Sequence, residues 1–150
     1  FPIIFRFSQW KTGHYDAKLA YTPEELEAFL APLTDAGVDI FDCSTRRFWE
    51  PEFEGSRLNL AGWTRKLTGK PTISVGSVGL KGDFTNAFDG GPEAEAASVE
   101  PLVERLKAGE FDLIAVGRAL LADAEWAEKI RHAREKEIHL FTKEDLKTLK

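Results

Sequence analysis

Four short apolar runs, each long enough for a buried strand, constrain the fold of this chain more than any other feature. They begin near residues 2, 38, 71 and 111, and stretches with the apolar spacing of a helix separate them. Apolar strands that alternate with helices predict a parallel sheet buried on both faces, and therefore an α/β fold. Two architectures fit this pattern: an open doubly wound sheet, or half of an eight-stranded βα barrel.

Local signals give the expected boundaries of the elements. Thr22 is predicted to cap a helix in which Pro23 takes the first position, Glu25 closes a capping box and Gly37 marks the end. The predicted strands are Pro2–Ser8, Val38–Cys43, Thr72–Val75 and Phe111–Val116, the remaining predicted helices are 60–67, 99–108, 123–135 and 142–149, and the predicted loops are 44–59 and 80–97.

Composition excludes several classes of protein. With 150 residues, 43% hydrophobic and 30% charged, the chain is expected to be a globular domain or part of a larger one. A net charge of −5 argues against nucleic-acid or membrane binding. The single Cys43 excludes an internal disulfide framework and a multi-thiolate metal site. Without a signal peptide, we expect a cytoplasmic protein. Because the chain lacks Met and opens inside an apolar strand, we expect a piece of a longer protein.

Two glycine-rich strand ends carry the strongest functional signal. The third strand runs into Gly76–Gly79, and the fourth runs into Gly117 and Arg118. Glycines let a backbone approach a ligand closely, and an arginine suits a phosphate oxygen. In βα barrels, the loops after the last two strands often build a phosphate site. Tight βα turns are the alternative explanation, but the pairing of two such ends with Arg118 favours a phosphate site.

Two further features leave alternatives open. Arg6 lies within an apolar strand, so it must meet either a carboxylate, Asp42 or Asp39, or an anionic ligand. The aromatic and charged segment Thr45–Phe53 could cover a planar ligand, or its aromatic side chains could pack onto the rim of the sheet. No metal-ligand spacing, Ser/His/Asp set, Walker loop or GxGxxG motif is present, and Cys43 is expected to be buried and inert.

Four segments of the chain match one known family: Phe5–Ser8, Gly37–Ser44, Val75–Gly79 and Phe111–Asp123. Together they resemble the old yellow enzyme family of FMN-dependent NADH:flavin oxidoreductases, which includes ene reductases. The resemblance runs from Phe1 to about Arg134. It implies a TIM (βα)8 barrel of which this chain supplies strands five to eight, a half barrel with a short C-terminal helix. Residues 1–135 would form the second half of the barrel, and residues 136–150 a helical tail.

The resemblance also implies a cofactor and its contacts. FMN would take hydride from NADH or NADPH and pass it to an activated alkene. Arg6 resembles the arginine that contacts the flavin ring. The cofactor's phosphate would be held by Ser77, Val78, Gly79, Gly117 and Arg118.

The resemblance places the catalytic residues outside this chain. The HxxH or HxxN pair that holds the substrate carbonyl is absent, and Tyr15 and Tyr21 do not match the proton donor. We therefore expect no catalytic residue in this half and no turnover by the isolated chain, which would pair with a missing N-terminal half or with a second copy. Two other functions remain open: a flavin-free phosphate-binding barrel enzyme, such as an isomerase or lyase, and a self-assembling half-barrel binding module.

Overall fold

The computed structural model describes residues 1–11, 14–81 and 95–147. The chain forms two compact units. Unit 1 comprises Phe1–Gly76 and Glu100–Ala115, and unit 2 comprises Ser77–Val99 and Val116–Lys150. Within the described ranges, no helix has the length and apolar character needed to cross a membrane.

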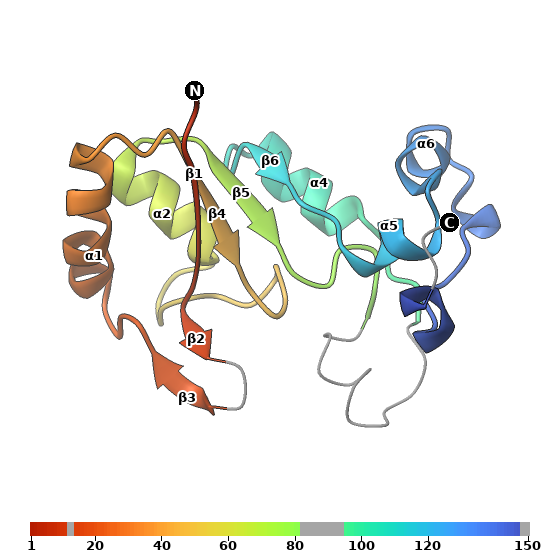
Figure 1. Ribbon diagram of the computed structural model, residues 1–150, viewed down its shortest axis with the longest axis horizontal. Coiled ribbons are helices and arrows are strands. Elements are labelled where there is room, and N and C mark those ends of the chain that lie inside the picture. Colours follow the sequence, from red (N-terminus) through yellow and green to blue (C-terminus); the bar gives the residue numbers. More distant parts are fainter. Residues whose placement is uncertain (12–13, 82–94, 148–150) are drawn as a thin grey trace. The chain divides into compact units, whose positions relative to one another are not determined.

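Unit 1 is built on a parallel sheet of four strands, as the alternation of apolar runs predicted (Figure 1). The strands lie side by side in the same order as along the chain, with the register Phe7 to Cys43 and Cys43 to Ser74. Consecutive order is typical of a barrel wall, whereas a doubly wound sheet reverses direction at a switch point. The strands are β1 (Ile4–Ser8), β4 (Ile40–Ser44), β5 (Thr72–Val75) and β6 (Leu113–Ile114).

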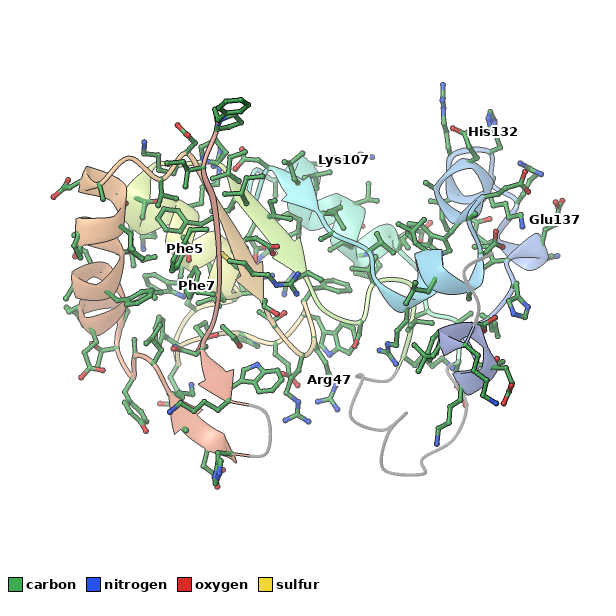
Figure 2. The ribbon with its side chains drawn as sticks, viewed as in Figure 1. Phe5, Phe7, Arg47, Lys107, His132 and Glu137 are labelled. Carbon is green, nitrogen blue, oxygen red and sulfur yellow. The ribbon has the colours of Figure 1, made fainter. Side chains whose placement is uncertain are left out.

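Helices α1 (Pro23–Asp35) and α2 (Leu60–Thr68) pack against each other and cover one face of this sheet (Figure 1). Phe5 and Phe7 of β1 point toward this helical side (Figure 2). The ring centroids of Phe7 and Phe29 of α1 lie 5.6 Å apart, and the buried Phe41 ring meets Phe7 edge-on at 6.2 Å. This aromatic cluster forms the core between β1, β4 and α1.

The predicted helix signals operate as expected. Thr22 Oγ1 accepts a hydrogen bond from the Glu25 N–H at 3.2 Å, so α1 begins at Pro23. Asn59 Oδ1 accepts from the Gly62 N–H at 3.0 Å and caps α2. Gly69 ends α2 with φ of 67°, a left-handed conformation that favours glycine.

The prediction that the first strand is buried on both faces is wrong. Only the Phe5 and Phe7 side is covered, while Ile4 is 55% exposed and the Arg6 side chain is 60% exposed. Period-two alternation puts Ile4 and Arg6 together on the sheet face that no helix covers. After β1 the chain forms a short antiparallel hairpin that was not predicted, β2 (Trp10–Lys11) and β3 (His14–Lys18).

The fourth predicted strand, Phe111–Val116, is shorter than expected. At its start, the carboxylate of Asp112 accepts the Thr72 N–H at 2.9 Å and the Arg65 Nε–H at 3.0 Å. The Thr72 N–H therefore bonds to a side chain where an earlier start of the strand would offer a backbone carbonyl, and this limits the pairing before β6. Helix α4 (Glu100–Lys107) precedes it, within the predicted range 99–108.

Unit 2 differs from the prediction in two helices. The predicted helix over 123–135 begins later, at Trp126. Asp123 still binds the turn that leads into it, because its Oδ1 accepts the Glu125 N–H at 3.0 Å, while Lys129 Nζ and the His139 N–H bind its Oδ2. Of the predicted helix over 142–149, the described residues form a 3₁₀ turn, although Thr142 and Asp145 make the expected capping box; residues 148 and 149 lie outside the described part of the chain. Most of the predicted loop 80–97 lies outside the described residues. The elements of unit 2 are α5 (Arg118–Ala122), α6 (Trp126–Arg131), η1 (Glu135–Glu137) and η2 (Lys143–Leu146).

Candidate functional site

Arg6 lies on the uncovered face of the sheet and has a structural partner there. Its Nη1 lies 3.5 Å from Asp42 Oδ2, and its Nη2 donates to Ser44 Oγ at 3.2 Å. Asp39, the other predicted partner, instead accepts the Ile3 N–H at 2.7 Å. Two contacts leave part of the five-donor guanidinium unused, and the side chain is 60% exposed. A planar acceptor can therefore approach Arg6 from the open side.

A pocket of about 170 Å³ lies where β1 and β4 end. We call it the rim pocket; its walls include Gln9, Trp10, Thr45, Arg46 and Glu52. The Arg46 guanidinium carbon lies 5.9 Å from the centre of the Trp10 ring, a cation–π contact. Functional sites of parallel α/β folds lie at the carboxyl ends of the strands, which is the edge that carries this pocket.

Glu52 is the titratable group of the rim pocket whose environment is most unusual. Burial raises the pKa of Glu52, while hydrogen bonding from Gln9 and the charge of Lys18 oppose this rise. The Gln9 Nε2–H donates to Glu52 Oε1 at 3.0 Å, and Lys18 Nζ lies 3.5 Å from the same oxygen. Gln9 also bonds both backbone groups of Ala20, which ties the hairpin to the strand end.

The segment Thr45–Phe53 packs its aromatic rings inward. Phe48 and Phe53 are buried, so these two side chains follow the rim-packing alternative and not the ligand-covering one. Asn59 Nδ2 and Arg105 Nη1 both donate to the Phe48 carbonyl, at 2.9 and 3.0 Å, and hold the segment in place. Gln9, Asn59 and Arg105 were not predicted from the sequence as residues that organise this region. Their position as polar residues next to apolar runs was the signal that could have indicated it.

The turn after β5 opens unit 2 with an unusual backbone. Ser77 has φ of 51°, which is strained for a residue with a side chain, and Gly79 has φ of 72°. The Leu80 N–H donates to the Ser77 carbonyl at 3.2 Å and closes the turn. Val78 is only 5% exposed, so its side chain belongs to the core and is not presented to a ligand. A Cβ on Gly79 would lie 3.0 Å from the Trp126 ring, so the turn packs closely on α6.

The other predicted phosphate residues lie at the start of α5. Gly117 is exposed, and a Cβ placed on it would have no heavy atom within 4 Å, so the space beside it is open. Arg118 is half-buried, and its guanidinium carbon lies 5.8 Å from the centre of the Phe141 ring. This cation–π contact restricts the side chain of Arg118.

All five predicted phosphate residues belong to unit 2, whereas Arg6 belongs to unit 1. Cys43 is fully buried, and burial raises the pKa of its thiol to about 12, so it does not form a thiolate nucleophile near neutral pH. Among the residues that the structure describes, no group of three or more His, Cys, Asp and Glu side chains is placed to hold a metal ion.

Comparison with known proteins finds similarity both in sequence and in structure. The chain is 30% identical over 148 residues to a protein named NADH oxidase from Thermoanaerobacter brockii, in an alignment that covers 92% of this chain and 19% of that protein. It resembles the solved structure of 6-hydroxypseudooxynicotine amine oxidase from Pseudomonas geniculata N1 with a TM-score of 0.50 and 22% identity, over 93% of this chain and 18% of that one. No known family profile matches the sequence.

These similarities establish a distant family relation and the fold of the chain. The chain is a distant homologue of an NADH oxidase and spans about a fifth of that protein's length. The structural likeness shows the fold alone: an α/β arrangement of four parallel strands and alternating helices, consistent with part of a βα barrel.

Proposed function

We propose that this chain is the second half, strands five to eight, of the FMN-binding barrel of an old yellow enzyme-type NAD(P)H oxidoreductase. The intact enzyme would reduce activated alkenes, with NADH or NADPH as hydride donor. The relation to an NADH oxidase supports a redox function that uses a nicotinamide cofactor. It also weighs against the flavin-free isomerase or lyase.

The observation that carries the proposal is the position of Arg6. A guanidinium in the middle of a strand, on the sheet face opposite α1 and α2, has one carboxylate at 3.5 Å and stays 60% exposed. An ion pair this exposed contributes little to stability, so the contact with Asp42 does not by itself account for a guanidinium at this position. A partly exposed guanidinium with donors left over, on the face that would line a barrel interior, suits an anionic or electron-rich ring.

Both units contain residues that are proposed to hold FMN. In unit 2, the open space beside Gly117 and the left-handed backbone at Ser77 and Gly79 fit a group that approaches main-chain N–H donors. Arg118 would add a charge-assisted contact to the phosphate. In unit 1, Arg6 would stabilise negative charge on the pyrimidine edge of the ring, and Asp42 and Ser44 would fix its orientation.

When bound, FMN would supply the hydride transfer between the nicotinamide donor and the alkene. The residues of this chain would bind and tune the cofactor, while the groups that hold the substrate and donate a proton would come from outside it. We therefore propose that turnover requires the remainder of the barrel, either as an N-terminal half or, less completely, as a second copy that closes the sheet.

The test is the identity of the cofactor in the full-length protein. We expect the purified protein to be yellow, to show the flavin absorption bands, and to release FMN on denaturation. NADPH or NADH should bleach these bands without oxygen, and an enone should restore them. A colourless protein that cannot be reconstituted with FMN would rule out the proposal and return the flavin-free barrel enzyme as the leading function.

A further inference from the structure

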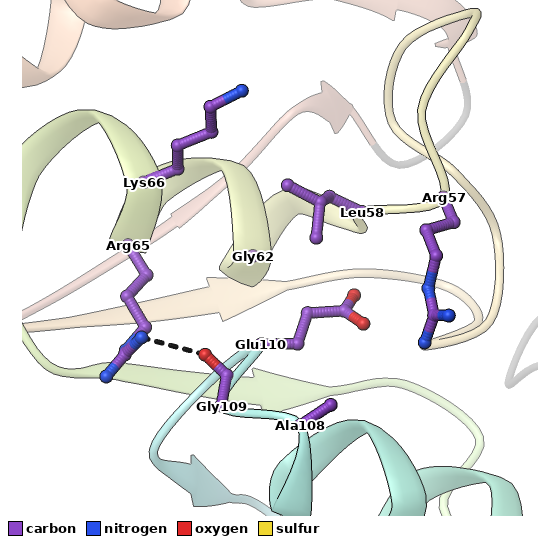
Figure 3. A pocket seen from close by; sticks show the side chains of 8 residues that line it. All are labelled: Arg57, Leu58, Gly62, Arg65, Lys66, Ala108, Gly109 and Glu110. Carbon is purple, nitrogen blue, oxygen red and sulfur yellow. Dashed lines mark hydrogen bonds between the residues drawn. The ribbon is translucent and has the colours of Figure 1, made fainter.

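A second pocket, unrelated to the strand ends, lies in the helical layer of unit 1. It has a volume of about 470 Å³, within the usual range for small-molecule sites, and opens between α2 and the turn from α4 to β6. Figure 3 shows Arg57 and Leu58 on one side, Arg65 of α2 on the other, and Gly109 and Glu110 between them. We call it the helix-layer pocket.

Glu110 carries the argument for a ligand. Its side chain is 3% exposed, and its Oε1 accepts hydrogen bonds from the Asn59 N–H at 3.1 Å and from Arg105 Nη1 at 3.2 Å. Its Oε2 has no hydrogen-bond partner among the described residues. A carboxylate oxygen buried without a donor is costly, so a donor is expected to reach it. Gly62 fixes the carboxylate's position, because a Cβ there would lie 2.7 Å from Glu110 Cγ.

The cations around Glu110 are not all neutralised. Arg65 is engaged by Asp112 at 3.0 Å and by the Gly109 carbonyl at 2.8 Å. Arg57, by contrast, is exposed and has neither an ion pair nor a hydrogen bond to any described residue. Its guanidinium points to the side of the pocket where the Glu110 carboxylate lies (Figure 3). The pocket therefore keeps a positive excess on a chain whose net charge is −5.

We propose that the helix-layer pocket binds a hydroxylated phosphate ester of the sugar phosphate class. The phosphate would meet Arg57, whose planar fork matches phosphate oxygens. A hydroxyl of the same molecule would donate to Glu110 Oε2 and satisfy it. The two contacts require an anion and a donor on separate parts of one ligand, because an anion placed against Glu110 would be repelled. The pocket volume also exceeds what a bare phosphate fills.

The test is calorimetric titration of the full-length protein with ribose 5-phosphate. We expect binding to weaken roughly ten-fold or more in Arg57→Gln, which removes a charge-assisted contact. It should be unchanged in Lys107→Gln, which makes the same charge change on α4 outside the pocket. Since Arg57 is exposed and bonds to none of the residues that the structure describes, its variant should keep the wild-type melting temperature. Methyl phosphate, which carries no sugar hydroxyl, should bind more weakly than ribose 5-phosphate.

Three results would overturn the proposal. The first is no binding of ribose 5-phosphate at millimolar concentration, and the second is equal binding of methyl phosphate. The third is binding that Arg118→Gln abolishes and Arg57→Gln leaves intact, since the ligand would then occupy the strand-end site. This last comparison keeps the failure of the helix-layer pocket separate from any failure of the proposed FMN site.

Discussion

At the scale of single residues, Arg6 has two roles that a conservative substitution separates. Its contacts with Asp42 and Ser44 need only a positive charge and a donor, which lysine retains. A ring contact, however, depends on the planar fork. Arginine and lysine at position 6 are therefore not equivalent if this side chain contacts a flavin ring.

We expect Arg6→Lys in the full-length protein to retain flavin and to lower its reduction potential. Negative charge on the reduced ring would lose part of its stabilisation when a point charge replaces the guanidinium. Potentiometric titration of the variant beside Arg131→Lys, an exposed arginine of unit 2, measures the difference. Equal potentials in wild type and Arg6→Lys would leave Arg6 with only its structural contact to Asp42.

Asp123 is a second residue whose role is testable, because one carboxylate organises much of unit 2. It accepts hydrogen bonds from Lys129 Nζ at 2.7 Å, from the His139 N–H at 2.9 Å and from the Glu125 N–H at 3.0 Å. Burial raises the pKa of Asp123, but these hydrogen bonds outweigh that effect and hold the pKa below its usual value of 3.8. The ionised carboxylate therefore stabilises the folded state at neutral pH.

We predict that Asp123→Asn lowers the free energy of unfolding by about 1–3 kcal/mol at pH 7. Because the folded pKa is lowered, this contribution is present above the unfolded pKa and is lost as the pH falls through the folded one. The difference between variant and wild type should therefore shrink below the usual aspartate pKa. Glu125→Gln, which alters an exposed partner of the same Lys129 at 3.8 Å, should change stability little. A difference independent of pH would contradict this account.

At the scale of elements, the signals that worked are those contained in a few neighbouring residues. Thr22 and Glu25 mark the start of α1, and β5 has the predicted bounds Thr72–Val75. These signals depend on local hydrogen bonds and on the apolar period, which sequence displays directly.

The elements that could not be predicted depend on partners distant in sequence. Asp123 accepts the nearby Glu125 N–H as the predicted cap would, but its second oxygen binds Lys129 and the backbone of His139, which the sequence did not indicate. Asp112, at the start of β6, bonds Thr72 and Arg65, which lie about forty or more residues away. Gln9 orders the hairpin through Ala20 and Glu52. In each case one polar side chain serves a contact that no local pattern encodes.

For the same reason, only some features of the candidate site could be predicted from the sequence. The glycines and Arg118 stand out because their residue types are unusual at strand ends. The presence of a carboxylate beside Arg6 was foreseen, but its exposure was not, because apolar neighbours such as Ile4 suggested burial on both faces. The sequence contains no pattern that predicts the helix-layer pocket. Arg57 and Glu110 are far apart in sequence, and they line the same pocket because α2 and the end of α4 lie side by side in the fold.

At the scale of the whole molecule, the uncovered face of the sheet determines how the chain behaves by itself. Ile4 and Leu113 are 55% and 50% exposed, and both lie on strands at the edges of the sheet. Exposed apolar side chains next to unpaired strand edges favour association. We therefore predict that the isolated 150-residue chain self-associates at micromolar concentration and does not reduce enones.

Light scattering measures this association, and replacing Ile4 and Leu113 together by threonine should reduce it. The matched control replaces Leu120 and Leu121, which are exposed on α5 of unit 2, by threonine, and it should leave the association unchanged. A stable monomer would contradict the role given to the open face, and NADPH-dependent enone reduction by the isolated chain would contradict the absence of catalytic residues from it.

The central claim is that this chain carries half of an FMN site, and the dissociation constant of FMN for Arg118→Ala tests it most directly. The half-buried guanidinium of Arg118 is proposed to make a charge-assisted contact with the phosphate, worth about 1.5–3 kcal/mol. The account predicts that FMN binds the full-length Arg118→Ala variant roughly ten- to a hundred-fold more weakly than wild type, while Arg131→Ala, an exposed arginine of the same unit, binds normally. An unchanged dissociation constant in Arg118→Ala would contradict the account.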